Sequence, residues 1–250
     1  EYLRNDAQQT RVKDITTTEA SLTLRYAPGE SFVNSKQRRI PVSLDAPIFT
    51  LTHTMGIKGV LGSDYSFNRT EASVWKRIWL PSSWGKVDCS LKAGAEWNTV
   101  PFPLLILPEA NLSYITQRET FNLINNMEFL NDRFASISLS YDMNGKLFNR
   151  IPLIKNLKWR EMFRVRALWG TLTDKNNPFK SSNPDLFRFP TRDGKFTSFV
   201  MDPKIPYVEA SVGIYNIFKL LHVEYVHRFT YRDNPGINKN GIRFMVLMVF

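Results

Sequence analysis

Apolar and polar residues alternate with a period of two over much of this chain, and this pattern leaves little room for helices. From Val87 to Trp97, every odd position is apolar and every even position is small or charged. Residues 135–143 and 221–231 follow the same pattern with few exceptions. A helix would mix the two classes on each of its faces, so the alternation predicts β-strands with one apolar and one polar face.

The same pattern, together with Gly- and Pro-rich boundaries, predicts nine strands along the 250 residues. Each predicted strand is near or above the ~9–11 residues that cross a bilayer at a tilt. We therefore predict one all-β unit over residues 1–250, with long loops at about 99–126 and 173–205. The strands are expected at about residues 14–27, 39–56, 63–80, 85–98, 127–144, 158–172, 206–216, 219–232 and 240–250.

The last forty residues indicate where the apolar faces lie. The final predicted strand is a nearly continuous apolar run that ends on the aromatic residue Phe250. Soluble proteins seldom finish on such a strand, whereas the last strand of a membrane barrel lies against lipid. The sequence therefore predicts an antiparallel transmembrane β-barrel. In barrels generally, a terminal aromatic is part of the signal read by the assembly machinery, so Phe250 is a candidate assembly signal.

Composition agrees with a barrel and argues against spanning helices. The longest apolar run, Val100 to Pro108, has nine residues and three prolines, far short of the ~20 that a spanning helix needs. Mean hydropathy is −0.27, which is ordinary for a barrel that alternates lipid-facing and lumen-facing residues. The net charge is +10, but Lys and Arg are spread along the chain. We expect them to line a polar lumen and the loops, and we predict no nucleic-acid partner.

Few residues form patterns that carry chemistry. The chain has one cysteine, Cys89, and three histidines, and it lacks a Gly-rich phosphate loop and a paired-Cys motif. We therefore predict no metal, no cofactor and no enzymatic activity. His222 and Glu224 are two residues apart on one predicted strand, so they share a face. Arg164 and Arg166 are expected to point into the lumen and to meet carboxylates on neighbouring strands.

Six strings in this chain are specific enough to compare with known families. They are found at residues 25–30 (RYAPGE), 121–125 (FNLIN), 150–161 (RIPLIKNLKWRE), 168–176 (LWGTLTDKN), 210–219 (ASVGIYNIFK) and 241–244 (GIRF). They resemble a large family of Bacteroidota outer-membrane proteins, which combine an N-terminal carboxypeptidase-regulatory-like domain with a C-terminal barrel. That family is in turn distantly similar to the BamA-type surface-antigen barrels, which have sixteen strands.

The resemblance implies that this chain supplies the last nine strands of a sixteen-strand barrel, with a first part upstream. It also implies that residues 101–126 form a loop inserted into the lumen. In the BamA-type superfamily such a loop has an Arg-Gly-Phe or Arg-Gly-Tyr tip, whose Arg pairs with carboxylates on the barrel wall. The nearest match is Arg118 followed by Glu119, with Glu in the place of Gly. Arg118 and Glu119 are therefore the candidate tip of the lumen loop.

We expect a non-enzymatic, integral β-barrel protein of the bacterial outer membrane that acts in transport, outer-membrane protein assembly or surface display. The expected partners are membrane lipid and lipopolysaccharide, the barrel-assembly machinery and other proteins of an outer-membrane complex. Three alternatives remain compatible with the sequence. They are an accessory barrel that anchors a periplasmic domain, a soluble basic all-β binding protein, and a lipid-modifying barrel enzyme, for which we find no site.

Overall fold

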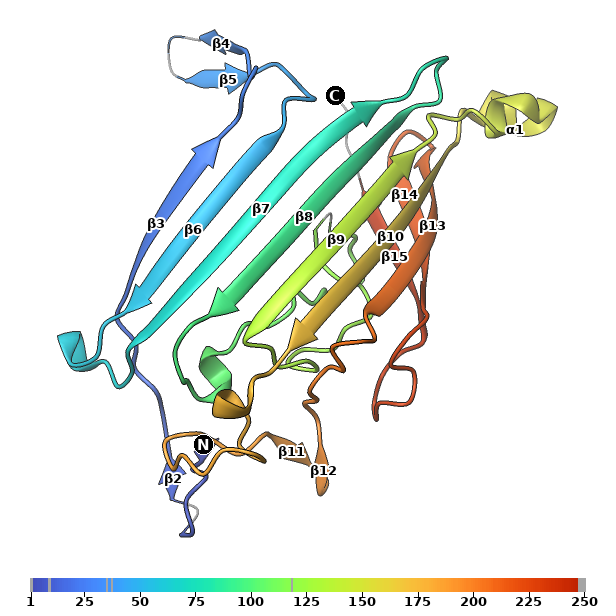
Figure 1. Cartoon of the computed structure of the whole chain (residues 1–250). Coiled ribbons are helices and arrows are strands. Elements are labelled where there is room, and N and C mark those ends of the chain that lie inside the picture. Colours follow the sequence, from blue (N-terminus) through green and yellow to red (C-terminus); the bar gives the residue numbers. More distant parts are fainter. Residues whose placement is uncertain (1, 9, 35, 37, 118, 247–250) are drawn as a thin grey trace.

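One long antiparallel sheet dominates the structure (Figure 1). The computed structural model describes residues 2–8, 10–34, 36, 38–117 and 119–246. Within these residues, nine strands pair in the order β3-β6-β7-β8-β9-β10-β13-β14-β15, and each pairs antiparallel with its neighbours. The strands are β3 (Glu19–Tyr26), β6 (Ile48–Gly56), β7 (Phe67–Trp79), β8 (Lys86–Glu96), β9 (Arg133–Asp142), β10 (Arg160–Thr171), β13 (Tyr207–Ile217), β14 (Leu221–Arg228) and β15 (Asn240–Val246).

The connections between these strands contain only short elements. Among the described residues, no helix has the length and apolar character that crossing a membrane requires. The short pieces are β1 (Tyr2–Leu3), β2 (Arg11–Val12), β4 (Phe32–Asn34), β5 (Arg39–Pro41), β11 (Thr191–Arg192), β12 (Lys195–Phe196), helix α1 (Pro152–Leu157), and the 3-10 turns η1 (Val60–Gly62), η2 (Phe102–Leu104), η3 (Phe148–Arg150) and η4 (Asp174–Asn176).

The prediction of nine strands is confirmed for the main sheet, but several predicted boundaries are wrong, and two of them differ most. The strand expected over 39–56 joins the sheet only from Ile48, because residues 39–41 pair with β4 in a separate hairpin. The strand expected over 127–144 begins at Arg133. Met127 has a φ of 57°, which interrupts extended backbone, and the residues that follow it are buried in the preceding connection.

The sheet is curved but not closed. Figure 1 shows β13, β14 and β15 turning back behind the strands that precede them, while β3 stays at the opposite edge. In the register of the described strands, β3 and β15 each have only one strand neighbour. The all-β part of the fold prediction is therefore confirmed, and the closed barrel stays a prediction.

One face of this sheet is apolar and exposed across all nine strands. Its residues are the predicted apolar positions, and the register places them opposite one another: Leu91 faces Val74 and Ile137 on the two adjacent strands. The larger exposed side chains of this face range from 37% exposure for Leu139 to 67% for Tyr26, while Val74 and Ile137 are partly buried. Eight spacings of about 4.8 Å make this face roughly 40 Å wide. Soluble monomers rarely expose such a continuous apolar surface.

The other face is polar and lies inside the curve. One register row crosses five strands and holds Ser90, Ser138, Arg166, Glu209 and Arg228. The three charged members of this row are buried, because the connection from β8 to β9 covers them. We call this connection, residues 97–132, the insert. Charged residues of the sheet therefore lie buried against the insert.

The insert also touches the free edge of β15. Ile115 forms a parallel bridge with Phe244. The amide of Thr116 donates to the Phe244 carbonyl (2.9 Å), and the Phe244 amide donates to the Tyr114 carbonyl (2.9 Å). Three residues of the insert thus act as a short additional strand beside β15.

Candidate functional site

The candidate site is the polar interior of the sheet together with the insert that lies on it. Two apolar clusters hold the insert in place. In one of them, Phe102 and Leu105 of the insert pack with Phe187 and Phe189 of the connection 172–206. In the other, insert residues join side chains of β10 and β13, and the members are Phe121, Ile124, Phe129, Leu168, Met201 and Tyr207. Apolar packing therefore places the backbone of the insert, and polar contacts then fix its orientation.

A buried polar contact joins Glu128 of the insert to Arg228 of β14. Two hydrogen bonds of 2.6 and 3.0 Å connect the guanidinium to the two carboxylate oxygens. Both side chains are almost fully shielded from solvent. The carboxylate also accepts hydrogen bonds from the Asn125 amide and from the Asn234 side chain. Such a fork-to-fork pair with additional donors is strong and directional, so it fixes the end of the insert.

Glu209 of β13 fixes the middle of the insert by a different chemistry. Its carboxylate accepts hydrogen bonds from the backbone amides of Asn122 (2.9 Å) and Leu123 (3.1 Å). It also accepts from the Tyr207 hydroxyl (2.9 Å) and from Arg166 (3.1 Å). The carboxylate is buried and its oxygens have donors on several sides, as a buried charge requires. Glu209, which lies on the inner face of the sheet, therefore binds the insert through backbone amides.

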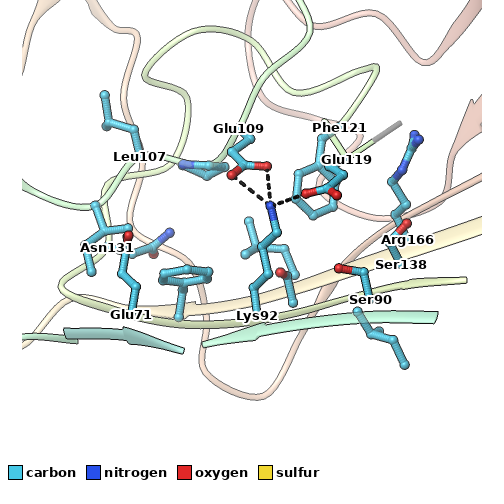
Figure 2. A pocket seen from close by; sticks show the side chains of 16 residues that line it. Glu71, Ser90, Lys92, Leu107, Glu109, Glu119, Phe121, Asn131, Ser138 and Arg166 are labelled. Carbon is cyan, nitrogen blue, oxygen red and sulfur yellow. Dashed lines mark hydrogen bonds and ion pairs between the residues drawn. The ribbon is translucent and has the colours of Figure 1, made fainter. Parts of the chain in front are cut away.

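Lys92 of β8 holds the other side of the insert. Figure 2 shows its ammonium group between Glu109 and Glu119, both of which belong to the insert. The Nζ atom lies 3.0 Å from Glu109 and 2.8 Å from Glu119. These carboxylates are about half exposed, so this contact is weaker than the buried pair at Arg228. A cavity of about 150 Å³ lies beside it.

A second polar network occupies the interior near the opposite end of the sheet. Arg164 donates to Glu224 at 2.6 Å, and Ser211 donates to the other oxygen of the same carboxylate. The Nε2 atom of His222 lies 3.3 Å from Glu224. The serine hydroxyl and the imidazole thus both contact the same carboxylate.

The interior also contains a larger polar cavity of about 670 Å³. Its wall carries charges of both signs, several of them paired: Arg77 binds Asp88 at 2.6 Å, and Lys86 lies 3.6 Å from Asp142. Among the described residues, no group of three His, Cys, Asp or Glu side chains is arranged to hold a metal ion. The cavity is lined by residues that include Thr50, Ser73, Trp75, Ser90, Lys92, Glu119, Ser138, Ser140, Arg164, Tyr215 and His222.

Outside the strands, Tyr231 joins two connections at the same end of the molecule. Its hydroxyl donates to the Ile205 carbonyl (2.7 Å) and accepts from the Asp202 amide (3.0 Å). Burial raises the pKa of the Tyr231 phenol above its ordinary value. The phenol is therefore neutral at physiological pH and keeps its proton for the Ile205 carbonyl.

The predicted site residues fall into two groups. Arg164 and Arg166 meet carboxylates of other strands, and His222 shares a face with Glu224, as the alternation predicted. Arg118 and Phe250 lie outside the described residues. Glu119 lies on the insert and binds Lys92, while its role as a loop tip stays a prediction.

Sequence reasoning missed the residues that fix the insert. The predicted strand over 127–144 includes Glu128, and the alternation predicts only that Glu209 and Arg228 lie on a polar face. Alternation gives the face of a residue but not its partner in a distant loop. The sequence signal for these two residues is their position in the alternation of their strands, which places Glu209 and Arg228 on the inner face.

Comparison with known proteins gives one family. The family described as "Family of unknown function (DUF5686) C-terminal domain" matches residues 2–179. No curated protein matches the chain. The matched part includes the insert and the strands from β3 to β10, while Glu209, Glu224 and Arg228 lie beyond it.

Proposed function

The chain belongs to the DUF5686 family through its C-terminal domain, and on that premise we propose that its curved sheet is part of a β-barrel in a bacterial outer membrane. The barrel is non-enzymatic, and its lumen is occupied by the insert. The sequence strings that resemble Bacteroidota outer-membrane proteins and BamA-type barrels support the same proposal. The resemblance suggests sixteen strands in the complete barrel, of which these nine are the last.

The observation that carries the proposal is the exposed apolar face of the sheet. Leu91, Val165 and Val212 are each about half exposed, and they lie on different strands of one face. In water, a surface of this kind promotes association and costs free energy, at about 25 cal/mol for each Å². Against lipid the same surface is favourable, and the polar interior then faces a lumen.

The strand lengths agree with a bilayer. The strands from β6 to β10, together with β13, have between 9 and 13 residues, and a tilted transmembrane strand needs ~9–11. Open edges of a sheet are not tolerated within hydrocarbon, because their amides and carbonyls lack partners there. The proposal therefore requires further strands between β15 and β3.

The lengths of the connections suggest an orientation. The two longest, the insert and residues 172–206, leave the sheet at the same end. The tight turns at 80–85 and 218–220 lie at the opposite end, which we call the short-turn end. Outer-membrane barrels keep long loops outside and short turns in the periplasm. We therefore place the short-turn end in the periplasm.

The insert favours some roles over others. It is bound to Lys92 of β8 and, through a buried ion pair, to Arg228 of β14, which does not suit an open pore for free diffusion. We favour a role in outer-membrane protein assembly, gated transport or surface display, with lipid, lipopolysaccharide, the assembly machinery and other proteins of a complex as partners. An accessory barrel that anchors a periplasmic domain is the second candidate, because an insert held in this way also suits a purely structural barrel.

A spin label at Cys89 tests the membrane proposal. Cys89 is the only cysteine of these 250 residues and lies on the apolar face, opposite Leu139. In the full-length protein, with any other cysteine removed and the protein reconstituted in vesicles, we expect a nitroxide here to collide with dissolved oxygen and not with a water-soluble nickel chelate. The matched control is Ser90→Cys in a Cys89→Ser background, which moves the label to the neighbouring, cavity-lining position.

At position 90 we expect the opposite preference, with access to the nickel chelate. The proposal fails if the label at position 89 is in water. It also fails if both positions are shielded from both reagents, because the apolar face would then be packed inside a protein core.

A further inference from the structure

The connection between β9 and β10 forms a basic, apolar projection at the short-turn end. We call this connection, together with Arg160 at the start of β10 (residues 143–160), the basic turn. It contains η3 and helix α1, which stands beyond the ends of the strands in Figure 1. Five of its residues are Lys or Arg, and none is Asp or Glu. The five cationic residues are Lys146, Arg150, Lys155, Lys158 and Arg160.

The local sequence explains why a short helix forms here. Pro152 occupies the first helical position, where its missing N–H costs nothing. Lys158 ends the helix with a left-handed φ of 55°, and its amide donates to the Lys155 carbonyl (3.2 Å). Within one turn, Leu153 and Leu157 are four residues apart and therefore share a face.

These apolar side chains point to solvent. Leu153 is 83% exposed and Leu157 is 49% exposed. Leu147 and Ile151, which precede the helix, are also exposed. Among the described residues, no carboxylate forms an ion pair with Arg150, Lys155 or Lys158. The surface thus combines exposed leucines with available positive charge.

The basic turn is nonetheless firmly attached to the sheet. The Asn216 side chain donates to the Lys158 carbonyl (2.7 Å), and the Leu147 amide donates to the buried carboxylate of Glu161 (2.7 Å). Lys146 donates to the Ser82 carbonyl (2.8 Å) and lies 5.2 Å from the centre of the Trp84 ring. The projection is therefore held at a fixed height relative to the strand ends.

A neighbouring turn at the short-turn end also exposes apolar side chains beside a positive charge. The turn from β13 to β14 exposes Phe218 (80%) and Leu220 (46%) on either side of Lys219. The nearest acids of β9 and β10 are already engaged: Asp142 accepts from the Tyr215 hydroxyl (2.6 Å), and Glu161 accepts from Leu147. The charge of this surface is therefore strongly positive beside its apolar side chains.

We propose that the basic turn docks on the anionic phospholipid surface beside the barrel. The leucines enter the boundary between headgroups and acyl chains, and the Lys and Arg side chains bind phosphate groups. Interfacial segments bind in this way, by burying apolar side chains and attracting anionic lipid. The inference rests on the proposed membrane location, and it adds a lipid class and a binding surface to it.

An environment-sensitive probe at position 153 tests the docking. The full-length protein with Cys89→Ser and Leu153→Cys is labelled with a nitrobenzoxadiazole dye and reconstituted in phosphatidylcholine vesicles, with or without phosphatidylglycerol. We expect phosphatidylglycerol to raise the emission of the dye and shift it to the blue. Replacing Arg150, Lys155 and Lys158 by Gln should lower the ratio of docked to undocked basic turn on phosphatidylglycerol vesicles by roughly 10- to 100-fold. Most or all of the emission change should then be lost.

The matched control removes three exposed charges at the opposite end of the molecule. In the same labelled protein, Arg192, Lys195 and Lys204 are replaced by Gln, and we expect the response at position 153 to be unchanged. A dye that stays in water on phosphatidylglycerol vesicles overturns the docking. So does a response that requires lipopolysaccharide instead of phosphatidylglycerol, or one that both triple variants lose equally.

The spin label at Cys89 separates this failure from failure of the membrane proposal. If position 89 is in lipid while the dye at 153 stays in water, only the docking is wrong. If both are in water, the membrane location is wrong and the docking falls with it.

Discussion

Arg228 of β14 and Glu128 of the insert are one hundred residues apart in the chain, and they meet in a two-point ion pair that solvent barely reaches. The pair ties a loop to the inner wall of a sheet whose outer face is apolar. Polar contacts are thus concentrated inside the curve, where Glu209 and Lys92 add to them. The inside of the curve therefore contains buried charges as well as apolar clusters, while the outer face of the sheet is apolar and exposed.

Breaking the buried pair at one partner should loosen the insert. Arg228→Met leaves the Glu128 carboxylate buried without its guanidinium, and we expect a loss of roughly 3–5 kcal/mol in the free energy of unfolding. Urea titration of the full-length protein in detergent measures this loss, and cleavage within the insert by a protease reports its release.

The double variant Arg228→Met with Glu128→Met is the control for that experiment. Because it removes both charges, it should recover most of the lost stability. If the double variant is as unstable as the sum of the two single variants, the pair does not act as a unit.

Lys92 should contribute less than Arg228, because its partners are about half exposed. We expect Lys92→Met to cost about 1 kcal/mol or less, and the effect should shrink further in high salt. The same urea titration at low and high ionic strength makes this comparison. A cost equal to that of Arg228→Met would show that exposure does not rank these two contacts.

An arginine on the outer face distinguishes lipid from water. Leu91 lies near the middle of β8 and is 45% exposed. In lipid, Leu91→Arg should cost ~2–4 kcal/mol and reduce the yield of assembled protein. In water, the same change at an exposed position should cost no more than about 0.5 kcal/mol.

Ser90→Arg is the matched control, since Ser90 faces the polar cavity. We expect it to assemble with nearly normal yield. Yield is measured as heat-modifiable protein in the membrane fraction. Equal yields for both arginine variants would contradict the facing assigned to β8.

Gly85 tests the tight turn between β7 and β8. It has a φ of 86°, and a Cβ atom there would overlap the backbone carbonyl oxygen of Asp142 on β9. We expect Gly85→Ala to cost roughly 2–4 kcal/mol, from left-handed strain plus displacement of the neighbouring backbone. The midpoint of urea unfolding measures the cost.

Gly29→Ala separates these two contributions. Gly29 has a φ of 76°, but its Cβ position has no atom within 4 Å among the described residues. It should therefore cost only about 1 kcal/mol, from strain alone. Similar costs at both glycines would mean that the close approach to Asp142 is unimportant.

The sequence predicts the sheet well because strand formation depends on local alternation. The pattern from Val87 to Trp97 reappears almost residue by residue as β8. Parity also places Arg164, Arg166 and Glu224 on one inner face, where they are found. These features follow from short stretches of chain and need no knowledge of distant contacts.

The parts that sequence could not predict depend on how separate segments meet. The predicted strand over 127–144 includes Glu128, yet its neighbour Phe129 is buried by packing of the insert on β10 and β13. The pairing of Glu128 with Arg228 requires both the strand register and the path of the insert. Neither the strand register nor the path of the insert can be read from the alternation of apolar and polar residues within one strand.

The short bridge between Ile115 and Phe244 has a consequence for how the sheet acquires its last neighbour. The backbone amide and carbonyl of Phe244 point away from β14, toward the free edge of β15. Both already form hydrogen bonds, the amide with the Tyr114 carbonyl and the carbonyl with the Thr116 amide. Any strand that pairs with β15 at this point needs the same two groups. Pairing of residues 114–116 with this edge and addition of an adjoining strand there are mutually exclusive, so one must be released before the other can form.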